Sequence, residues 1–160
     1  MAYQMSNDGG ALGSMNPAIR FSQSGAESTG REGIYADRVE ARVGQTVTLS
    51  ALIQDRGLRE KYPENKSLSV PLGTEWIMHQ GPATPSFSQA SITGKERAES
   101  QGESAAAGSN GWSEVITQAT FSVPGNYIIR LRVDNFEADD SQFDNQCCWS
   151  NAYVPVTVVR

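Results

Sequence analysis

The chain has 160 residues, 38% of them hydrophobic, which is enough for one domain with a substantial core. Its formal net charge is −5 and its basic residues are scattered, so the sequence has neither a basic stripe for nucleic acid nor a polybasic patch for insertion into a membrane. No apolar run approaches the roughly 18 residues that would span a bilayer. The first residues lack the pattern of a secretory signal, so we expect either a cytoplasmic protein or a mature or trimmed chain.

The N-terminal part of the chain, residues 1–37, is rich in Gly, Ser, Asn and Gln and is predicted to be an extended segment. One stretch in it, PAIRFS at residues 17–22, alternates apolar and polar side chains. This alternation predicts a single isolated strand.

Residues 38–160 carry the pattern of short, half-buried strands. The run DRVEARVGQTVTLSALI alternates with a period of two and is rich in Val and Thr. Two polar stretches, at about 54–73 and 89–114, interrupt the pattern and are predicted to be long loop insertions, the second with a segment that could form a short helix. Several short strands without a convincing long helix predict an all-β fold, a two-sheet antiparallel sandwich.

The most regular pattern lies in EVITQATFSVPGNYIIRLRVDN, which predicts two strands joined by a turn at Pro124–Asn126. In the second of these strands, Tyr127 and every second residue up to Val133 share one apolar face. The last predicted strand, AYVPVTVV, contains Pro155, which cannot donate a ladder hydrogen bond. We therefore expect this strand at a sheet edge, or its proline at a position without such a bond.

Four of these segments together resemble a known family. VGQTVTLSA, a tryptophan in a short strand followed by QGP, TQATFSVPGNYIIRLRVDN and a terminal VPVTV resemble the PKD (polycystic kidney disease) and related immunoglobulin-like β-sandwich domains, over roughly residues 38–160. The resemblance implies that Trp76 fills the core between the sheets and that a GxYxxxLxV strand pairs beside the final strand. In this chain the residues of that strand are Gly125, Tyr127, Leu131 and Val133.

The chain departs from the family at one turn. WIMHQGPATPSF replaces the usual Trp-x-Phe-Gly-Asp-Gly motif, so functions tied to that turn are not carried over. The replacement resembles the variant in repeats of bacterial extracellular proteins. The resemblance therefore implies a secreted or cell-surface location and a role as a spacer, an adhesion module or an appendage of a secreted enzyme.

The sequence offers little for catalysis. A Ser-His-Asp or Cys-His arrangement would have to use His79, the single histidine, which lies on the predicted outward face of its strand. The sequence contains no nucleophile elbow, phosphate-binding loop or zinc-ligand spacing. We expect a protein that is not an enzyme.

An acidic run, VDNFEADDSQFDN, is the best candidate for metal chemistry. Calcium takes six to eight oxygen ligands, and a loop this dense in carboxylates supplies that type of ligand, although its spacing does not match an EF-hand. A solvated acidic loop is the alternative. The predicted ligands of Ca²⁺ are Asp134, Glu137, Asp139, Asp140 and Asp144.

Aromatic residues in or beside the predicted loops raise the alternative of carbohydrate binding. Trp112, Trp149 and Tyr62 are candidates for stacking on a sugar ring, although such residues more often cover the edges of a small sandwich core. Asn65 begins an Asn-Lys-Ser sequon in a polar loop and is a candidate for glycosylation in a secreted protein.

The two cysteines, Cys147 and Cys148, are adjacent and follow the acidic run. Three states stay open for this pair. Both thiols are free, the two form a strained vicinal disulfide, or one cross-links to another subunit.

Two functions follow from the sequence. The first is a non-enzymatic structural or adhesive module outside the cell, in which the strand at 17–22 adds to the edge of its own sheet or of a neighbour's sheet. Addition to a neighbour would propagate a fibre. The second is an accessory carbohydrate- or protein-binding domain of a secreted enzyme or receptor. The expected partner is therefore a further copy or a neighbouring domain in the first case, and a polysaccharide or a protein in the second.

Overall fold

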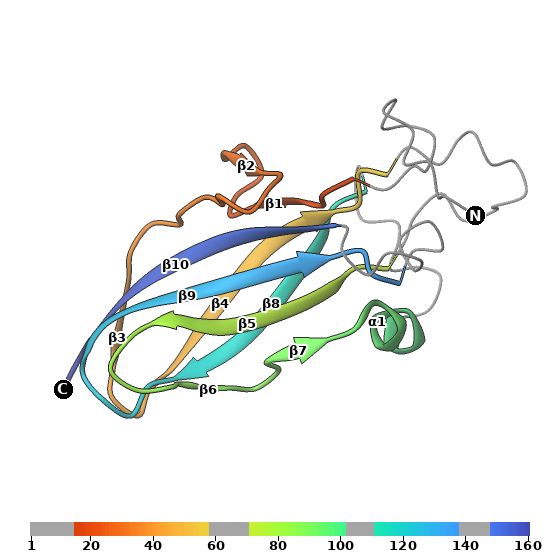
Figure 1. The fold of residues 1–160 in the computed structure, drawn as a ribbon. Coiled ribbons are helices and arrows are strands. Elements are labelled where there is room, and N and C mark those ends of the chain that lie inside the picture. The colour runs from red at the N-terminus through yellow and green to blue at the C-terminus, as the bar shows by residue number, and fades with distance from the viewer. Residues whose placement is uncertain (1–14, 58–70, 102–110, 138–147) are drawn as a thin grey trace, which may run out of the picture.

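The computed structural model describes residues 15–57, 71–101, 111–137 and 148–160. In this part of the chain two five-stranded sheets pack face to face, and sheet B lies in front of sheet A in Figure 1. The all-β, two-sheet fold predicted from the sequence is confirmed.

Sheet A contains strands β2, β1, β4, β8 and β6 in that spatial order. Their bounds are Glu27–Ser28, Ala18–Arg20, Thr46–Gln54, Ser113–Thr120 and Ser86–Phe87. Sheet B contains β3, β10, β9, β5 and β7. Their bounds are Val39–Arg42, Trp149–Val159, Gly125–Asp134, Gly73–Gln80 and Ser91–Ile92. Neighbouring strands are antiparallel except β3 and β10, which are parallel.

The strand order is that of an immunoglobulin-like sandwich. β1, β4, β8 and β6 occupy the places of strands A, B, E and D, and β5, β9 and β10 occupy those of C, F and G. After β5 the chain enters sheet A for β6 and returns to sheet B for β7, before the helix α1 (Gly94–Gln101) leads toward β8. Within the described ranges, no helix is long and apolar enough to cross a membrane.

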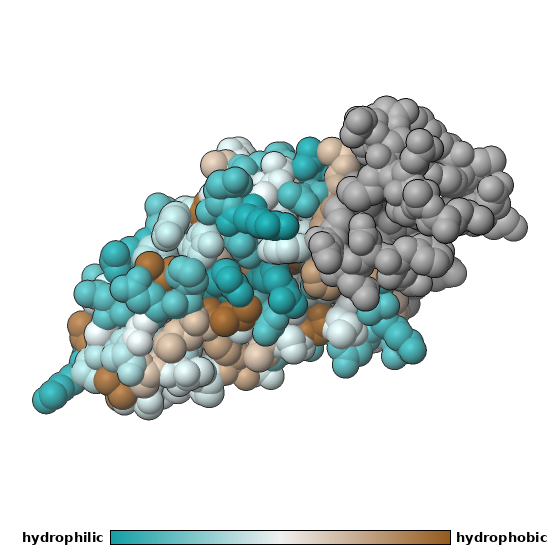
Figure 2. Space-filling view, in the orientation of Figure 1, coloured by the Kyte–Doolittle hydropathy of each residue, from teal (hydrophilic) through white to brown (hydrophobic). Residues whose placement is uncertain are grey.

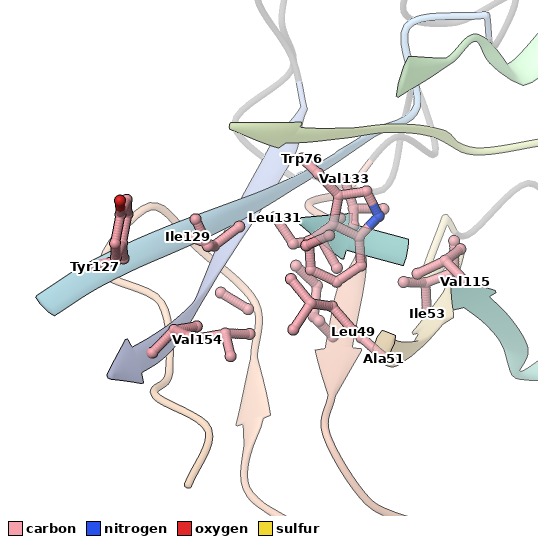
Figure 3. Packing of buried hydrophobic residues seen from close by; sticks show 14 of the residues in the cluster. Leu49, Ala51, Ile53, Trp76, Val115, Tyr127, Ile129, Leu131, Val133 and Val154 are labelled. Carbon is pink, nitrogen blue, oxygen red and sulfur yellow. The ribbon is translucent and has the colours of Figure 1, made fainter. Parts of the chain in front are cut away.

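Alternate residues of the inner faces build the core (Figure 3). Trp76 of β5 is only 4% exposed and reaches between the sheets, as the family resemblance implied. β9 contributes four side chains to this core, each at most 1% exposed: Tyr127, Ile129, Leu131 and Val133. The face predicted for these four residues is therefore confirmed. Full burial of one such side chain stabilises the fold by about 1.5–3 kcal/mol.

A tyrosine corner closes the connection between β8 and β9. The Tyr127 hydroxyl donates a hydrogen bond to the backbone carbonyl of Val123, at 2.6 Å. Its ring meets the ring of Phe121 edge-on, with 4.7 Å between the centroids. A tyrosine at the start of strand F that bonds back to the preceding corner is a hallmark of immunoglobulin-like sandwiches.

The N-terminal segment completes both sheets of its own sandwich. β1 lies inside the stretch predicted as an isolated strand, but it pairs with β4 on one side and with β2 on the other. Its Ala18 and Ile19 are fully buried. Beyond β2 the chain runs along β10, where the Asn151 N–H donates to the Gly30 carbonyl at 3.0 Å, and continues as β3.

β10 lies between β3 and β9, so the prediction that it is an edge strand is wrong and the alternative holds. On the side away from β9, Tyr153 exchanges backbone hydrogen bonds with Ile34 and Ala36. Pro155 has the same backbone orientation as Tyr153, because the two are two residues apart in a strand. Its nitrogen therefore points toward the N-terminal segment just before β3, whose register with β10 begins at Val156↔Val39 and gives Pro155 no partner.

Candidate functional site

The acidic run predicted to bind calcium is described only in part. Asp134 and Glu137 lie among the described residues, whereas Asp139, Asp140 and Asp144 lie outside them. Where the chain is described, no three His, Cys, Asp or Glu side chains gather as a metal site would require. The calcium site stays a prediction.

Asp134 is bound by its own chain at the end of β9. One carboxylate oxygen accepts a hydrogen bond from the Phe136 N–H at 3.2 Å, and the other lies 3.8 Å from the Arg132 guanidinium. Gly73 leaves the space that this carboxylate fills, because a Cβ there would lie 2.7 Å from Oδ1. Burial raises the pKa of Asp134, and the Phe136 hydrogen bond and the Arg132 charge oppose this rise.

Cys148 is buried beside a fully buried asparagine, whereas Cys147 lies outside the described residues. The Cys148 N–H donates to the Asn135 side-chain carbonyl at 2.9 Å, and the Asn135 N–H donates to the Cys148 carbonyl at 3.2 Å. The Asn135 side chain also donates to the carbonyl of Met15, at 2.9 Å. This amide ties the start of β10 to the N-terminal segment, and the state of the cysteine pair stays a prediction.

Both described candidates for sugar stacking have one ring face covered by arginine. The Arg20 guanidinium lies 4.2 Å from the Trp112 ring centroid, and that of Arg31 lies 4.1 Å from the Trp149 centroid. These contacts are cation–π interactions between side chains of the domain itself, and they cover the ring face on which a sugar could stack. Tyr62 and Asn65 lie outside the described residues, so carbohydrate binding and glycosylation stay predictions.

His79 is exposed, as predicted, and belongs to an aromatic cluster on the outer face of sheet B. Its ring centroid lies 5.2 Å from that of Tyr153, which stacks at 5.0 Å on Tyr35. Tyr35 is 61% exposed. Elsewhere on the face seen in Figure 2, hydrophobic residues form small separate patches among hydrophilic ones. The cluster is a surface feature that sequence alternation alone did not predict.

The helix α1 is a polar element that is held by its cap and by one arginine. Thr93 is the N-cap, because its hydroxyl accepts a hydrogen bond from the Glu96 N–H while the Glu96 carboxylate accepts bonds from the Thr93 N–H and hydroxyl. The bonds to Thr93 lower the pKa of Glu96. Arg97 fixes the helix to sheet B, since it donates to the Leu72 carbonyl and to the Thr74 hydroxyl, both at 2.8 Å.

A pocket of about 250 Å³ lies beside Arg97, between β5 of sheet B and β8 of sheet A. Its lining residues are Thr74, Trp76, Gln89, Arg97, Glu114, Val115 and Ile116, which come from both sheets, from the β6–β7 connection and from α1. Arg97 is only 8% exposed, and this burial lowers its pKa. The pocket therefore brings a buried guanidinium to the edge of the hydrophobic core.

The sequence contained a signal for the helix but none for the pocket. Thr93-Gly94-Lys95-Glu96 has the spacing of a capping box, which identifies a helix start. The partners of Arg97 lie 23 and 25 residues earlier in the chain, so no local pattern predicts that its side chain is buried.

No protein-family model matches the chain, and no curated protein matches it. Among solved structures, the D00-D0 domain of intimin is similar over 79% of this chain and 45% of that chain, with 12% identity and a TM-score of 0.42. Domains 4 and 5 of the S-layer protein SbsC match over 91% of this chain and 54% of that one, with 16% identity and a TM-score of 0.42. The ASH/PapD-like domain of human CEP192 matches over 92% and 87%, with 10% identity and a TM-score of 0.45.

This chain spans about half the length of the first two of those structures. All three identities are below 25% and all three TM-scores are below 0.5. The fold assignment therefore rests on features of the chain itself: the order of the strands, the buried Trp76 on β5 and the Tyr127 corner. These features make the chain an immunoglobulin-like β-sandwich.

Proposed function

We propose that the chain is a non-enzymatic structural module that works outside the cell or at its surface, and that it assembles by exchange of its N-terminal strand. In such an exchange, the segment that contains β1 leaves its own sandwich and completes the sandwich of a neighbouring copy. Extended segments bind sheet edges through main-chain hydrogen bonds, with buried side chains setting the register.

One observation carries this proposal. The N-terminal segment pairs with the edge of β4 in sheet A and with the edge of β10 in sheet B. β1 pairs with β4 in the register Ile19↔Ile53, and the following chain continues along β10 into β3. Because β1 and β2 precede all the other described strands in chain order, a second copy can supply them without any change in the topology of the later strands.

The positions of the two ends favour a unit that stands in series with others. Met15, the first described residue, is held by Asn135 at the end where β9 finishes. The last paired residue of β10, Val159, lies at the opposite end, beside Arg42 of β3 (Figure 1). Exchange between such units is head-to-tail and extends into a fibre unless it closes into a ring.

Sedimentation velocity tests the proposal with three proteins at micromolar concentration. The full chain is expected to form a concentration-dependent series of oligomers. A variant that lacks residues 1–30 is expected to lose this series and to regain a defined complex when a synthetic peptide of residues 15–30 is added. Full-length protein that sediments as a single monomer over the whole concentration range would contradict the proposal.

A further inference from the structure

We infer that the pocket beside Arg97 binds the carboxylate of an acidic peptide, which lies as an extended strand along the open edge of β8. This inference goes beyond the proposed function and does not depend on strand exchange. It rests on two donors that face the pocket and on the backbone of one strand.

The first donor is the indole N–H of Trp76. The side chain lines the pocket and is 96% buried, since the residue is only 4% exposed. In the part of the chain that the structure describes, the indole nitrogen donates no hydrogen bond, and it is not among the fully enclosed unpaired atoms. The nitrogen therefore keeps some accessible surface, and Figure 3 shows it on the side of the ring nearer to Val115, another pocket residue. We infer that this surface faces the pocket.

The second donor is the guanidinium of Arg97. Its Nε and Nη2 atoms are used by Leu72 and Thr74, which fix the plane of the group. Its Nη1 atom makes no hydrogen bond with a described residue, and no described carboxylate lies within ion-pair distance of the group. A buried guanidinium ordinarily has an anionic partner. A carboxylate in the pocket supplies that partner and accepts the Trp76 hydrogen bond as well.

The open edge of β8 supplies the rest of the site. Gln118 exchanges hydrogen bonds with Ser88 on the side of β8 away from β4. Backbone groups two residues apart point the same way, so Ile116 and Glu114 also direct their N–H and C=O groups to this side. On this side of β8, β6 pairs only with Ala119 and Thr120. Among the described strands, none pairs with β8 on this side at Glu114 or Ile116.

These two features select an extended peptide with one acidic group. Unpaired strand edges accept a further strand. The side chains of Glu114 and Ile116 alternate with the buried Val115 and point to the outer face of sheet A, so these residues present backbone to the pocket. One buried positive charge balances one carboxylate, whereas a phosphate group carries up to two negative charges. The exposed Glu114 carboxylate on the outer face of sheet A still repels an anionic ligand through its charge and weakens the binding of that ligand.

The test uses two blocked seven-residue peptides of alternating Thr and Val that differ only in one central residue, Glu or Gln. Binding to the full chain is followed by the NMR resonance of the Trp76 indole N–H, assigned with Trp76→Phe. We expect a saturable shift with the Glu peptide and at least about tenfold weaker binding of the Gln peptide, the loss typical of a charge-assisted hydrogen bond. Equal affinities, or no saturable shift, would overturn the proposal.

Variants separate the two parts of the site. Arg97→Met is expected to weaken the Glu peptide about tenfold and to leave the Gln peptide unchanged. Glu114→Gln is expected to strengthen the Glu peptide alone, a gain that disruption of the fold cannot imitate. Ile116→Pro removes an N–H that points to the open edge and should weaken both peptides, with Ile116→Thr as the matched control. Unchanged binding in Arg97→Met, or weaker binding in Glu114→Gln, would refute the assignment.

Sodium acetate and inorganic phosphate serve as small-ligand probes. Acetate is expected to shift the same indole resonance only at much higher concentration than the Glu peptide. If acetate binds as tightly as the peptide, the β8 edge plays no part and the peptide proposal fails. If phosphate binds more tightly than both, the ligand class is wrong.

Discussion

Removing the Tyr127 hydroxyl isolates the contribution of the tyrosine corner to the stability of the sandwich. The Tyr127→Phe substitution keeps the ring, which is 1% exposed and packs against Phe121, but it deletes the 2.6 Å hydrogen bond to the Val123 carbonyl. Val123 is 37% exposed and its neighbours Ser122 and Pro124 are also exposed, so we expect water to replace the lost hydrogen bond at its carbonyl. The loss is therefore the net value of one hydrogen bond, about 1 kcal/mol, rather than the larger cost of a buried unpaired acceptor.

Tyr153→Phe is the matched control for this experiment. Tyr153 is also buried, at 8% exposure, but no described residue forms a hydrogen bond with its hydroxyl. Urea denaturation at pH 7, followed by tryptophan fluorescence, should show a loss of about 1 kcal/mol for Tyr127→Phe and a change within about 0.5 kcal/mol for the control. A domain of this size should also lose about 2–4 °C in Tm. Equal stability of the two variants would refute the role given to the corner.

Three further predictions concern the loop end and the helix. Asp134→Asn should raise Tm relative to the native chain, and the difference in Tm should grow as pH rises from about 4 to 7. Burial raises the pKa of Asp134 in the folded state, so its protonated form favours folding. The native chain loses that stability as pH rises through the folded-state pKa, whereas the Asn variant does not. Thermal melts at fixed ionic strength check this, and a constant difference would contradict it. Calcium at millimolar concentration should raise the Tm of the native chain, and Asp134→Asn should reduce this gain; no effect of calcium would remove the predicted metal site. Thr93→Ala should cost about 1 kcal/mol through the lost N-cap and increase amide exchange in α1, whereas Ser100→Ala, in the last turn of the same helix, should leave exchange of the first turn unchanged.

The sequence was informative where one face of a strand is buried along its length. In β9, the alternation from Tyr127 to Val133 predicted both the strand and its inner face, because a slip of one residue would expose the whole apolar set. Trp76 was assigned to the core through the family resemblance, and it lies there at 4% exposure.

Features that depend on contacts distant in sequence could not be predicted in the same way. Alternation identified a strand around Ile19, but nothing local specifies that β4 is its partner. Pro155 argued for an edge strand, and only the path of the N-terminal segment along β10 shows how a proline is accepted in the interior of a sheet. Arg97 occurs in a polar run typical of solvated loops, yet it is only 8% exposed and donates hydrogen bonds to Leu72 and Thr74.

The most direct test of strand exchange is a cysteine pair that records which sandwich β1 occupies. Arg20 lies opposite Leu52 in the β1–β4 register. Opposed residues of an antiparallel pair have Cα atoms about 4.5–5.5 Å apart, within reach of a disulfide. The measurement is a non-reducing gel of the chain with Arg20→Cys and Leu52→Cys, oxidised at low and at high protein concentration, with each single variant as a control. The account predicts cross-linked monomer at low concentration and a reducible ladder of multimers at high concentration that neither single variant forms. Cross-linked monomer alone at every concentration would show that β1 stays in its own sheet and would contradict the proposed assembly.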